Sequence, residues 1–460
     1  MSDSAFSSQA LKKELLDNLD SLGYQAMTPI QMQSLPLIIE GKDVIAQGQT
    51  GSGKTAAFGL GLLNKLDVKR FRIQSLVLCP TRELADQVAK EIRKLARAIH
   101  NIKVLTLCGG MPFGPQVGSL EHGAHIIVGT PGRVEEHVRK GNLKLNNVDT
   151  LVLDEADRML DMGFQEALDT IIEDIPEERQ TLLLSATYPK QIQSIAAQYL
   201  TDPVMVKVES THSDSSIEQH FYELPDQDER IDAVHRILMQ YQPPSTVIFC
   251  NTKRETQDLA DALHDRNFSA IAIHGDMEQR DRDQTLVRFS NQSASILVAT
   301  DVAARGLDIK DLDAVINFHI ARDSEVHVHR VGRTGRAGSK GLAFTLYAEK
   351  ERYRIDRLEQ YLNKEIVAEA LPSADVLAKK PFYPPMKTIQ IDGGKKQKVR
   401  PGDILGALTG DKTIEATSIG KINIFDFSAY VAVEHKVSRK ALEKISKGKL
   451  KGRNFRARFI

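Results

Sequence analysis

Short apolar runs alternate with stretches of helical periodicity through the first 210 residues of the chain. Five apolar runs predict buried strands at residues 43–46, 75–79, 125–128, 150–153 and 181–184. Apolar residues three and four positions apart predict helices that include residues 10–21, 83–98 and 164–175. Because strands that alternate with helices form βαβ units, this region is expected to be an α/β domain with a parallel sheet.

The same alternation returns after a polar stretch of small residues at 210–216, which predicts a flexible linker. Strands are predicted at 246–250, 270–273, 295–299, 314–318 and 342–346, and a proline-rich break follows at 381–385. The predicted organisation is therefore an N-terminal helix and motif at 1–34, α/β domains at 35–209 and 218–375, linkers at 210–217 and 376–386, and a small domain at 387–460.

The last segment has the pattern of a small α+β domain. Strands are predicted at 388–391, 419–424, 427–433 and 455–460, and helices at 401–408 and 438–446. This βαββαβ order is that of an RNA-recognition motif. The aromatic signature of that motif is a poor match, because placing Tyr430-Val431 on its core leaves Ser428 and Val433 where aromatic residues are expected.

Composition is that of a soluble globular protein, with 27% charged and 41% apolar residues. No apolar run is long enough to span a membrane, and the N-terminus has no basic and apolar export signal. The three cysteines have no C-x-x-C spacing, which argues against a disulfide framework or a zinc site. These features favour a cytoplasmic protein, in which Cys79 and Cys250 are buried small hydrophobes.

Positive charge is concentrated at the C-terminal end of the chain. Residues 376–460 hold 19 lysines and arginines against seven acidic residues, although the whole chain has a formal net charge of zero. A basic segment of this kind suits a polyanion, and the acidic remainder is expected to bind one through a local groove.

Residues 48–55, Gly-Gln-Thr-Gly-Ser-Gly-Lys-Thr, match the phosphate-binding pattern G-x-x-x-x-G-K-[ST] without a mismatch. A predicted strand enters this loop and a predicted helix leaves it, as in a phosphate-binding loop. A flexible glycine-rich loop without a ligand is the simpler alternative. Backbone N–H groups and the helix N-terminus would hold phosphate oxygens. Lys54 is expected to bind the β- and γ-phosphates, and Thr55 to supply a hydroxyl for Mg²⁺.

Polar motifs follow the predicted strands at their carboxyl ends, where open parallel sheets bind ligands. They are Pro80-Thr81-Arg82-Glu83-Leu84-Ala85, Thr130-Pro131-Gly132-Arg133, Asp154-Glu155-Ala156-Asp157 and Ser185-Ala186-Thr187. Asp154 is placed to help hold Mg²⁺ beside the phosphate loop, and Glu155 is the candidate that orients or activates the attacking water. An exposed acidic turn is the alternative for this pair.

The ordered set of motifs resembles the DEAD-box RNA helicases over roughly residues 6 to 350. Further blocks carry this resemblance: Phe6, Gly23-Tyr24, Thr28-Pro29-Ile30-Gln31, Gly109-Gly110, Gln279 to Arg282, Ala299 to Asp308 and His329 to Arg336. The resemblance implies two tandem RecA-like domains, with the RRM-like domain following them. It also implies an RNA-stimulated ATPase that uses ATP and Mg²⁺, with no DNA or membrane partner.

The resemblance further implies roles for individual residues. Gln31 would read the adenine edge while Tyr24 or Phe6 packs nearby, and Arg333 and Arg336 would reach the γ-phosphate as arginine fingers. Ser185 and Thr187 would couple hydrolysis to duplex opening. The implied nucleotide-binding residues are Tyr24, Gln31, Gln47, Gly48, Gln49, Thr50, Gly51, Ser52, Gly53, Lys54, Thr55, Gly306 and Asp308.

RNA is expected to bind along its sugar-phosphate chain, which positions a strand without reading bases. The residues implied in the two α/β domains are Thr81, Arg82, Gly110, Thr130, Arg133, Gly275, Arg282, Thr300 and Asp301. Since Lys54 and Asp154 belong to one domain and Arg333 and Arg336 to the other, the family likeness implies that hydrolysis requires the domains to close. A bent RNA strand cannot stay paired, which implies local duplex opening.

In the C-terminal domain, basic loops are expected to bind RNA through Lys398, Arg400, Lys451, Arg453 and Arg456. A solvated charged surface is the alternative. The core with this tail resembles a bacterial DEAD-box group of large-subunit assembly, which implies recognition of a 23S ribosomal RNA hairpin on pre-50S particles. Two rival functions stay open: a general RNA helicase of cold adaptation or RNA decay, and an ATP-gated RNA clamp with little turnover.

Overall fold

The computed structural model describes residues 4–48, 51–208, 217–304, 312–335 and 340–460. The described residues up to 208 form one compact unit, and those from 217 onward form a second. Most of the predicted 210–217 linker lies outside the described residues, and its last residue, Ile217, begins a strand. No helix in the described ranges is long and apolar enough to cross a membrane.

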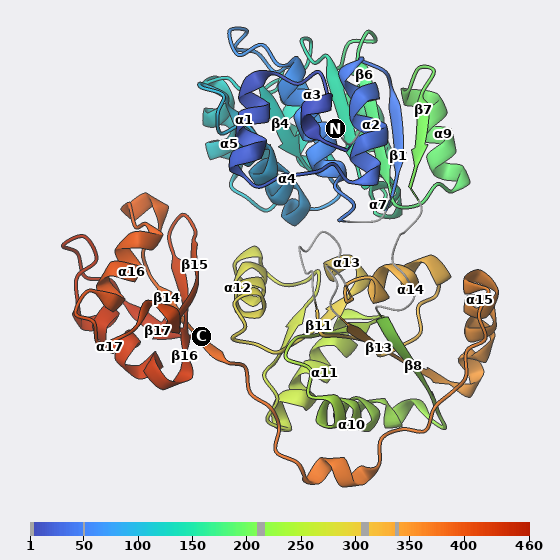
Figure 1. The fold of residues 1–460 in the computed structure, drawn as a ribbon, viewed down its shortest axis with the longest axis vertical. Coiled ribbons are helices and arrows are strands. Elements are labelled where there is room, and N and C mark those ends of the chain that lie inside the picture. Colours follow the sequence, from blue (N-terminus) through green and yellow to red (C-terminus); the bar gives the residue numbers. More distant parts are fainter. Residues whose placement is uncertain (1–3, 49–50, 209–216, 305–311, 336–339) are drawn as a thin grey trace. The chain divides into compact units, whose positions relative to one another are not determined.

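The first unit contains a seven-stranded sheet with the order β3-β4-β2-β5-β6-β1-β7 (Figure 1). Every strand pair in it is parallel. The strands are β1 (Val44–Gln47), β2 (Ser75–Leu78), β3 (Val104–Leu107), β4 (Ile126–Gly129), β5 (Thr150–Asp154), β6 (Gln180–Ser185) and β7 (Val204–Lys207). The five predicted strands are confirmed. The sequence pattern missed β3 and β7 because they are edge strands with partly exposed side chains.

Helices cover both faces of this sheet. They are α1 (Lys13–Ser21), α2 (Pro29–Ile39), α3 (Lys54–Lys65), α4 (Arg82–Leu95), α5 (Phe113–Glu121), α6 (Pro131–Arg139), α7 (Ala156–Asp161), α8 (Gln165–Glu173) and α9 (Lys190–Tyr199). The apolar sides of α1 to α4 form one core cluster, and those of α6 to α9 form a second cluster on the opposite face. Successive residues of a buried strand point to these two clusters in turn, as Val77 and Leu78 do.

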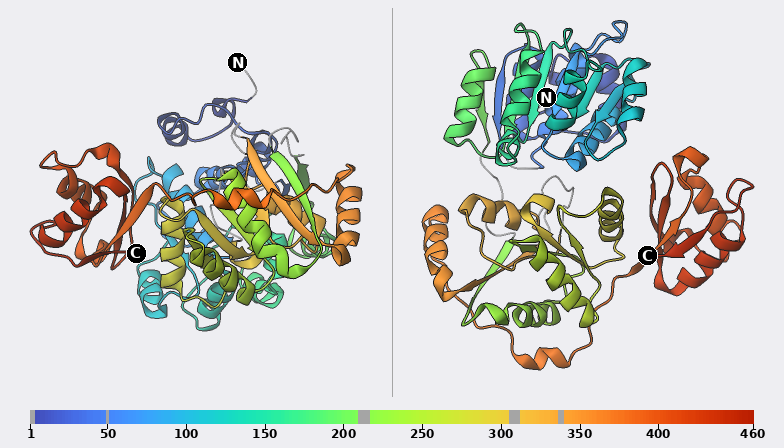
Figure 2. Two further views of the ribbon diagram at one scale, coloured as in Figure 1. Left: turned by 90° about the horizontal axis from the view of Figure 1, so that it is seen from below. Right: turned by 180° about the vertical axis from the view of Figure 1, so that it is seen from behind.

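The second unit begins with a six-stranded parallel sheet of the order β10-β11-β9-β12-β13-β8. Its strands are β8 (Ile217–Leu224), β9 (Thr246–Cys250), β10 (Ala270–Ile273), β11 (Ile296–Thr300), β12 (Ala314–Asn317) and β13 (Gly341–Ala348). Its helices are α10 (Arg230–Tyr241), α11 (Lys253–Asp265), α12 (Gln279–Ser290), α13 (Asp301–Ala304), α14 (Ser324–Val331) and α15 (Arg352–Leu362). Figure 2 shows from two further sides how helices flank this sheet.

The C-terminal domain is an antiparallel four-stranded sheet with the order β15-β16-β14-β17 and two helices packed on one face. Its elements are β14 (Met386–Ile391), α16 (Pro401–Thr409), β15 (Ile419–Ile424), β16 (Ala429–Glu434), α17 (Ser438–Lys447) and β17 (Ala457–Phe459). The predicted βαββαβ order is confirmed. The sheet face opposite these helices offers little for base stacking, because Tyr430 on it is only 2% exposed.

The segment predicted as a proline-rich linker makes extensive contacts. Val376 is buried in the core of the second unit, and Phe382 packs edge-on against Phe268 with 5.7 Å between ring centroids. The structure thus attaches much of the segment 376–386 to the second α/β sheet, a contact that its proline content does not reveal.

Candidate functional site

The phosphate-loop sequence follows β1 and leads into α3, which begins at Lys54. Gly51 and Gly53 have φ values of 89° and 98°, a region that side chains rarely adopt. A β-carbon added at Gly53 would lie 2.6 Å from Gln31 Nε2, so only glycine fits there. The hydroxyl oxygen of Ser52 is buried without a partner among the described residues. Gln49 and Thr50, which were also predicted to bind nucleotide, lie outside the described residues.

Lys54 is 8% exposed, and its amine donates to the carbonyl oxygen of Gly48. Burial lowers the pKa of Lys54, while the nearby carboxylate of Asp154 acts against that shift. Thr55 follows in the first turn of α3. The lysine therefore lies inside the loop beside buried acidic groups, as a phosphate-binding amine requires.

The predicted adenine-reading segment packs directly on this loop. Thr28 Oγ1 donates to the Ser52 carbonyl at 2.7 Å, and Gln31 Nε2 donates to the Gly53 carbonyl at 3.1 Å. Gln31 Oε1 accepts from Thr28 N–H at 2.8 Å. An amide offers two N–H donors and two acceptor lone pairs, so these contacts leave one donor and one acceptor of Gln31 unused. No separate role was predicted for Thr28 from the sequence.

Tyr24 and Phe6 lie against the same side of the first unit. Their rings meet edge to face at a centroid distance of 6.2 Å, and the Tyr24 hydroxyl donates to Glu91 at 2.6 Å. Lys94 lies over the Tyr24 ring at 5.0 Å. Burial and Glu91 raise the pKa of Tyr24. These contacts hold the aromatic pair of Phe6 and Tyr24 against α4, which carries Glu91 and Lys94.

Asp154 is the last residue of β5 and is 3% exposed. Burial raises the pKa of this carboxyl to about 7, helped by Glu155 and opposed by Lys54. Glu155 follows with a left-handed φ of 52°, and its carboxylate pairs with Arg158 at 2.7 Å. β5, β6 and β1 are neighbours in the sheet. The acidic motif after β5 and the phosphate loop after β1 therefore lie at the same carboxyl end of the sheet.

A hydrogen-bonded chain joins the acidic motif to the end of β6. Asp157 Oδ2 accepts from both the backbone N–H and the hydroxyl of Thr187, at 3.1 and 2.9 Å. Ser185 Oγ in turn donates to the Thr187 carbonyl at 2.6 Å. The backbone carbonyl of Ser185 accepts from Gly48 N–H at 3.1 Å, and the side-chain amide of Gln47 reaches the Ala186 carbonyl at 3.4 Å. The motif after β6 thus contacts both the phosphate loop and Asp157, whose role the sequence analysis missed.

Five predicted RNA-contacting residues of the first unit gather at the carboxyl ends of β2, β3 and β4, which are adjacent in the sheet. Arg82 lies so close over Gly110 that an added β-carbon there would overlap the guanidinium. Thr130 Oγ1 accepts from Gly109 N–H at 3.3 Å, and Arg133 donates to the Met111 carbonyl at 2.9 Å. Thr81 caps α4 by accepting from Leu84 N–H.

The buried Nη1 of Arg82 has no hydrogen-bond partner among the described residues. A buried charged donor left unpaired is costly, so an oxyanion bound there would complete its hydrogen bonding.

In the second unit, the predicted RNA-contacting residues lie at the carboxyl ends of the neighbouring strands β10 and β11. Arg282 donates to the carbonyl of His274, the residue before Gly275, at 3.2 Å. Thr300 Oγ1 accepts from Ala303 N–H at 3.3 Å. Asp301 accepts two hydrogen bonds from Arg330, both at 2.7 Å.

Arg330 is 2% exposed and is the central cation of this edge. Besides Asp301, it donates to Asn317 Oδ1 at 3.2 Å and to the His319 carbonyl at 2.9 Å, and it stacks over Phe249. Arg330 belongs to the motif from His329 to Arg336, but no role was predicted for it from the sequence. Its bidentate pairing with Asp301, which lies far away in sequence, left no local signal.

Arg333 is 8% exposed just after α14, and its backbone carbonyl accepts from Leu312 N–H at 3.3 Å. The other residues predicted to meet the nucleotide from the second α/β domain, Gly306, Asp308 and Arg336, lie outside the described residues.

Basic residues of the C-terminal domain come together from two loops. Lys451 donates to the Lys398 carbonyl at 3.2 Å, which joins the loop after α17 to the loop before α16. Arg400 precedes α16, and the Arg456 carbonyl accepts from Asp392 N–H at 2.9 Å. Arg453 closes the turn with Leu450. All five predicted tail residues thus lie on two adjoining loops, and Arg456 contacts the start of the first.

The metal expected at this site is Mg²⁺ held together with the nucleotide. No group of three or more histidine, cysteine, aspartate or glutamate side chains within the described ranges could hold a metal ion. Mg²⁺ takes few protein ligands in such sites, and the Thr55 hydroxyl and the buried Asp154 carboxylate are hard oxygen donors of the required kind.

All three cysteines are buried, and burial raises the pKa of Cys108 to about 12.

Comparisons with known families match nearly all of these elements. Residues 28–195 match the DEAD/DEAH box helicase family, residues 229–338 the helicase conserved C-terminal domain, and residues 388–459 the DbpA RNA binding domain. Together they confirm the predicted resemblance and the fold class.

Individual relatives agree. The chain is 53% identical to the ATP-dependent RNA helicase DbpA of Escherichia coli over 97% of both chains. It is 42% identical to the DEAD-box helicase CshA of Bacillus subtilis over 79% of this chain and 74% of that protein. The structure of S. cerevisiae Dbp5 bound to RNA and ADP BeF3 is similar with a TM-score of 0.71 and 27% identity, covering 80% of this chain and 95% of that one.

Proposed function

The chain belongs to the DEAD-box family of ATP-dependent RNA helicases, and from that premise we propose that it opens short stretches of 23S ribosomal RNA during large-subunit assembly. The observation that carries this proposal is the C-terminal domain, which matches the DbpA RNA binding domain and brings basic residues of two loops together. The two α/β domains supply the ATPase and hold the RNA backbone. The basic domain selects the RNA on which they act.

We propose that the phosphates of ATP bind the loop at Gly48–Thr55, with Lys54 neutralising the β- and γ-phosphates. Thr55 and Asp154 would hold Mg²⁺, which would neutralise part of the negative charge of the phosphates. Glu155 accepts a proton from the water that attacks the γ-phosphorus, and the bond to the leaving ADP oxygen breaks. Arg333 and Arg336 stabilise the phosphoryl charge that spreads in this step.

Gln31 is assigned to the adenine base, because its amide retains one donor and one acceptor beside the phosphate loop. RNA phosphates are assigned to Arg82 and Arg133 at the carboxyl ends of the strands of the first unit. In the second unit they are assigned to Gly275, Arg282 and Thr300. These contacts grip a strand without reading bases. A general RNA helicase would use the same residues. The observation that favours it is the similarity to CshA, which covers the chain outside the tail.

Removing the Thr187 hydroxyl is expected to uncouple hydrolysis from strand separation. In T187A the Asp157 carboxylate loses the 2.9 Å hydrogen bond from the side chain but keeps the one from the backbone. We expect RNA-stimulated ATP hydrolysis to persist, while duplex opening per ATP falls about 10-fold. Steady-state ATPase and short-duplex unwinding assays measure the two. T187S retains the hydroxyl and serves as the control, and equal losses in both assays for T187A would contradict a coupling role.

Deleting the C-terminal domain is expected to abolish the preference for the 23S hairpin while preserving ATP hydrolysis. The cut belongs after Pro385, because Val376 and Phe382 pack on the second α/β sheet. ATPase stimulation by a 23S fragment with the hairpin is compared with stimulation by poly(U). The full chain is expected to favour the hairpin RNA at least about 10-fold, and the truncated chain to respond to both alike.

A full-length variant makes the same test without truncation. R453A/R456A removes two cations of the basic loops, and R439A/K440A removes two exposed cations of α17 as the matched control. Loss of hairpin preference only in the first variant supports reading by the loops. Retained preference in the truncated chain would show that the tail is not the reader, whereas equal stimulation of the full chain by both RNAs would favour the general helicase.

A further inference from the structure

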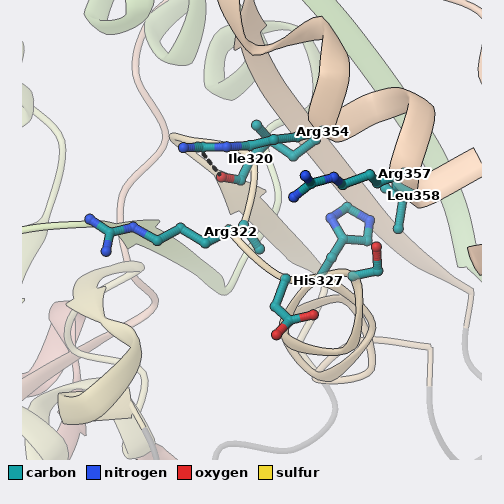
Figure 3. A pocket seen from close by; sticks show the side chains of 9 residues that line it. Ile320, Arg322, His327, Arg354, Arg357 and Leu358 are labelled. Carbon is teal, nitrogen blue, oxygen red and sulfur yellow. Dashed lines mark hydrogen bonds between the residues drawn. The ribbon is translucent and has the colours of Figure 1, made fainter.

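The second unit has a small, partly open hollow where α14 begins and α15 passes over it (Figure 3). Its lining includes Arg322, Ser324 and His327 from the α14 side, and Arg354 and Arg357 from α15. None of these five residues is among those assigned to ATP or RNA above. The hollow is therefore separate in its residues from the site already described.

His327 lies at the base of this hollow with an exposure of only 1%. Neither ring nitrogen has a hydrogen-bond partner among the described residues, and one ring face stacks on Phe221 at 5.9 Å. Burial, with Arg330 nearby, lowers the pKa of His327 to about 3, so the ring is neutral at pH 7. A neutral imidazole carries one donor and one acceptor, and leaving both buried and unpaired is unfavourable. A ligand in the hollow would satisfy them.

Arginine side chains give the hollow its charge. Figure 3 shows Arg357 reaching from α15 toward the His327 ring, while Arg322 extends away. Arg357 makes no hydrogen bond or ion pair within the described ranges and only lies over the Tyr353 ring, at 5.5 Å. Arg354 donates to the Ile320 carbonyl at 3.5 Å and pairs with Glu351 at 3.4 Å. Arg354 and Arg357 of α15 thus line the hollow together with one acidic residue, Asp323.

The first turn of α14 adds neutral donors to these charges. Ser324 begins the helix, and the initial backbone N–H groups of a helix have no partner within it. The Ser324 hydroxyl and these N–H groups are suited to an anion, as is the neighbouring free fork of Arg357. We propose that this hollow binds a small phosphate-bearing oxyanion, held by Arg357, Ser324 and His327 with support from Arg354.

A tryptophan reporter tests the site in the full-length protein. The chain contains no tryptophan, and Tyr353 is 49% exposed beneath both Arg354 and Arg357. Y353W places the single indole there and keeps an aromatic face for the guanidinium groups. Its fluorescence is followed during titration with inorganic phosphate and pyrophosphate, with saturating MgADP in the phosphate loop and NaCl additions as the ionic-strength control. A saturable change is expected with pyrophosphate and not with NaCl.

Two variants in the Y353W background assign the signal to the hollow. R357Q is expected to weaken apparent pyrophosphate affinity at least about 10-fold, since it removes a charged bidentate donor. H327F keeps the stacking on Phe221 but removes both ring nitrogens, and it is expected to weaken affinity too. R352Q removes an arginine of the same helix that does not line the hollow, and its affinity should be unchanged. The exposure of Arg357 makes R357Q safe for folding even if H327F is not.

The oxyanion could be a free phosphate compound or the terminal phosphate of an RNA. A short RNA with a 5′-phosphate is therefore compared with the same RNA bearing a 5′-hydroxyl. A response that requires the 5′-phosphate and is lost in R357Q identifies the RNA end as the ligand. If pyrophosphate binding is saturable and the two RNAs give equal responses, the ligand is a free phosphate compound. No saturable change beyond that of NaCl, or equal affinity in R357Q and the parent, would overturn the proposal.

Discussion

Replacing Glu155 by glutamine is expected to lower the turnover number for ATP by about 10²- to 10⁴-fold, the usual contribution of a general base. The amide has nearly the same shape as the carboxylate, so its oxygen still accepts from Arg158, which now lies 2.7 Å from Glu155. ATP and RNA binding should persist, because neither Lys54 nor the RNA edges change. The variant should accumulate a complex with both ligands bound.

Single-turnover ATP hydrolysis and the dissociation of labelled RNA after a chase measure the two effects. E166Q makes the same chemical change at an exposed residue of α8 and should behave as the wild type. If hydrolysis of ATP releases RNA, the RNA complex should live much longer in E155Q than in the wild type. A clamp with little turnover should show similar lifetimes in both proteins. Unchanged hydrolysis in E155Q would refute the role assigned to Glu155.

Removing Arg330 is expected to disrupt the second α/β sheet and not only its chemistry. R330A would leave the Asp301 carboxylate, which now accepts two 2.7 Å hydrogen bonds, without its cation. It would also unpair Asn317 Oδ1 and the His319 carbonyl. Breaking a buried ion pair by removing one partner typically costs about 3–5 kcal/mol. The loop at Thr300 and Asp301, assigned to RNA, should lose its geometry in the same step.

Denaturant unfolding followed by circular dichroism should show an earlier transition in R330A. RNA-stimulated ATPase should be lost even at temperatures where the chain stays folded. R333A is the matched comparison, since it removes a guanidinium three residues further on. We expect it to lower turnover by about 10³-fold as an arginine finger would, with a much smaller effect on unfolding. If R333A and R336A both kept full RNA-stimulated turnover, the assignment of catalytic groups to both α/β domains would fail.

Sequence reasoning predicted the central strands and the long amphipathic helices because a buried strand and a half-buried helix each impose a local period on apolar residues. It located the phosphate loop, because a tight turn around phosphate requires glycines and a lysine at fixed spacing. It missed the edge strands β3, β7 and β8, whose partly exposed side chains resemble loop sequence. It also took the segment at 376–386 for a linker although Val376 and Phe382 are packed.

What the sequence by itself determined about this protein is therefore its periodic elements, their order and the motifs at their ends. Only the tertiary structure decided which of those ends meet. The sheet order β5-β6-β1 joins Asp157 to Thr187 and Ser185 to Gly48, and the fold of the second unit joins Arg330 to Asp301. Contacts between residues far apart in the chain depend on strand order and packing, which no local period encodes. The same reason hid His327, which Phe221 and the arginines of α15 surround and whose ring nitrogens find no hydrogen-bond partner in the described part of the chain.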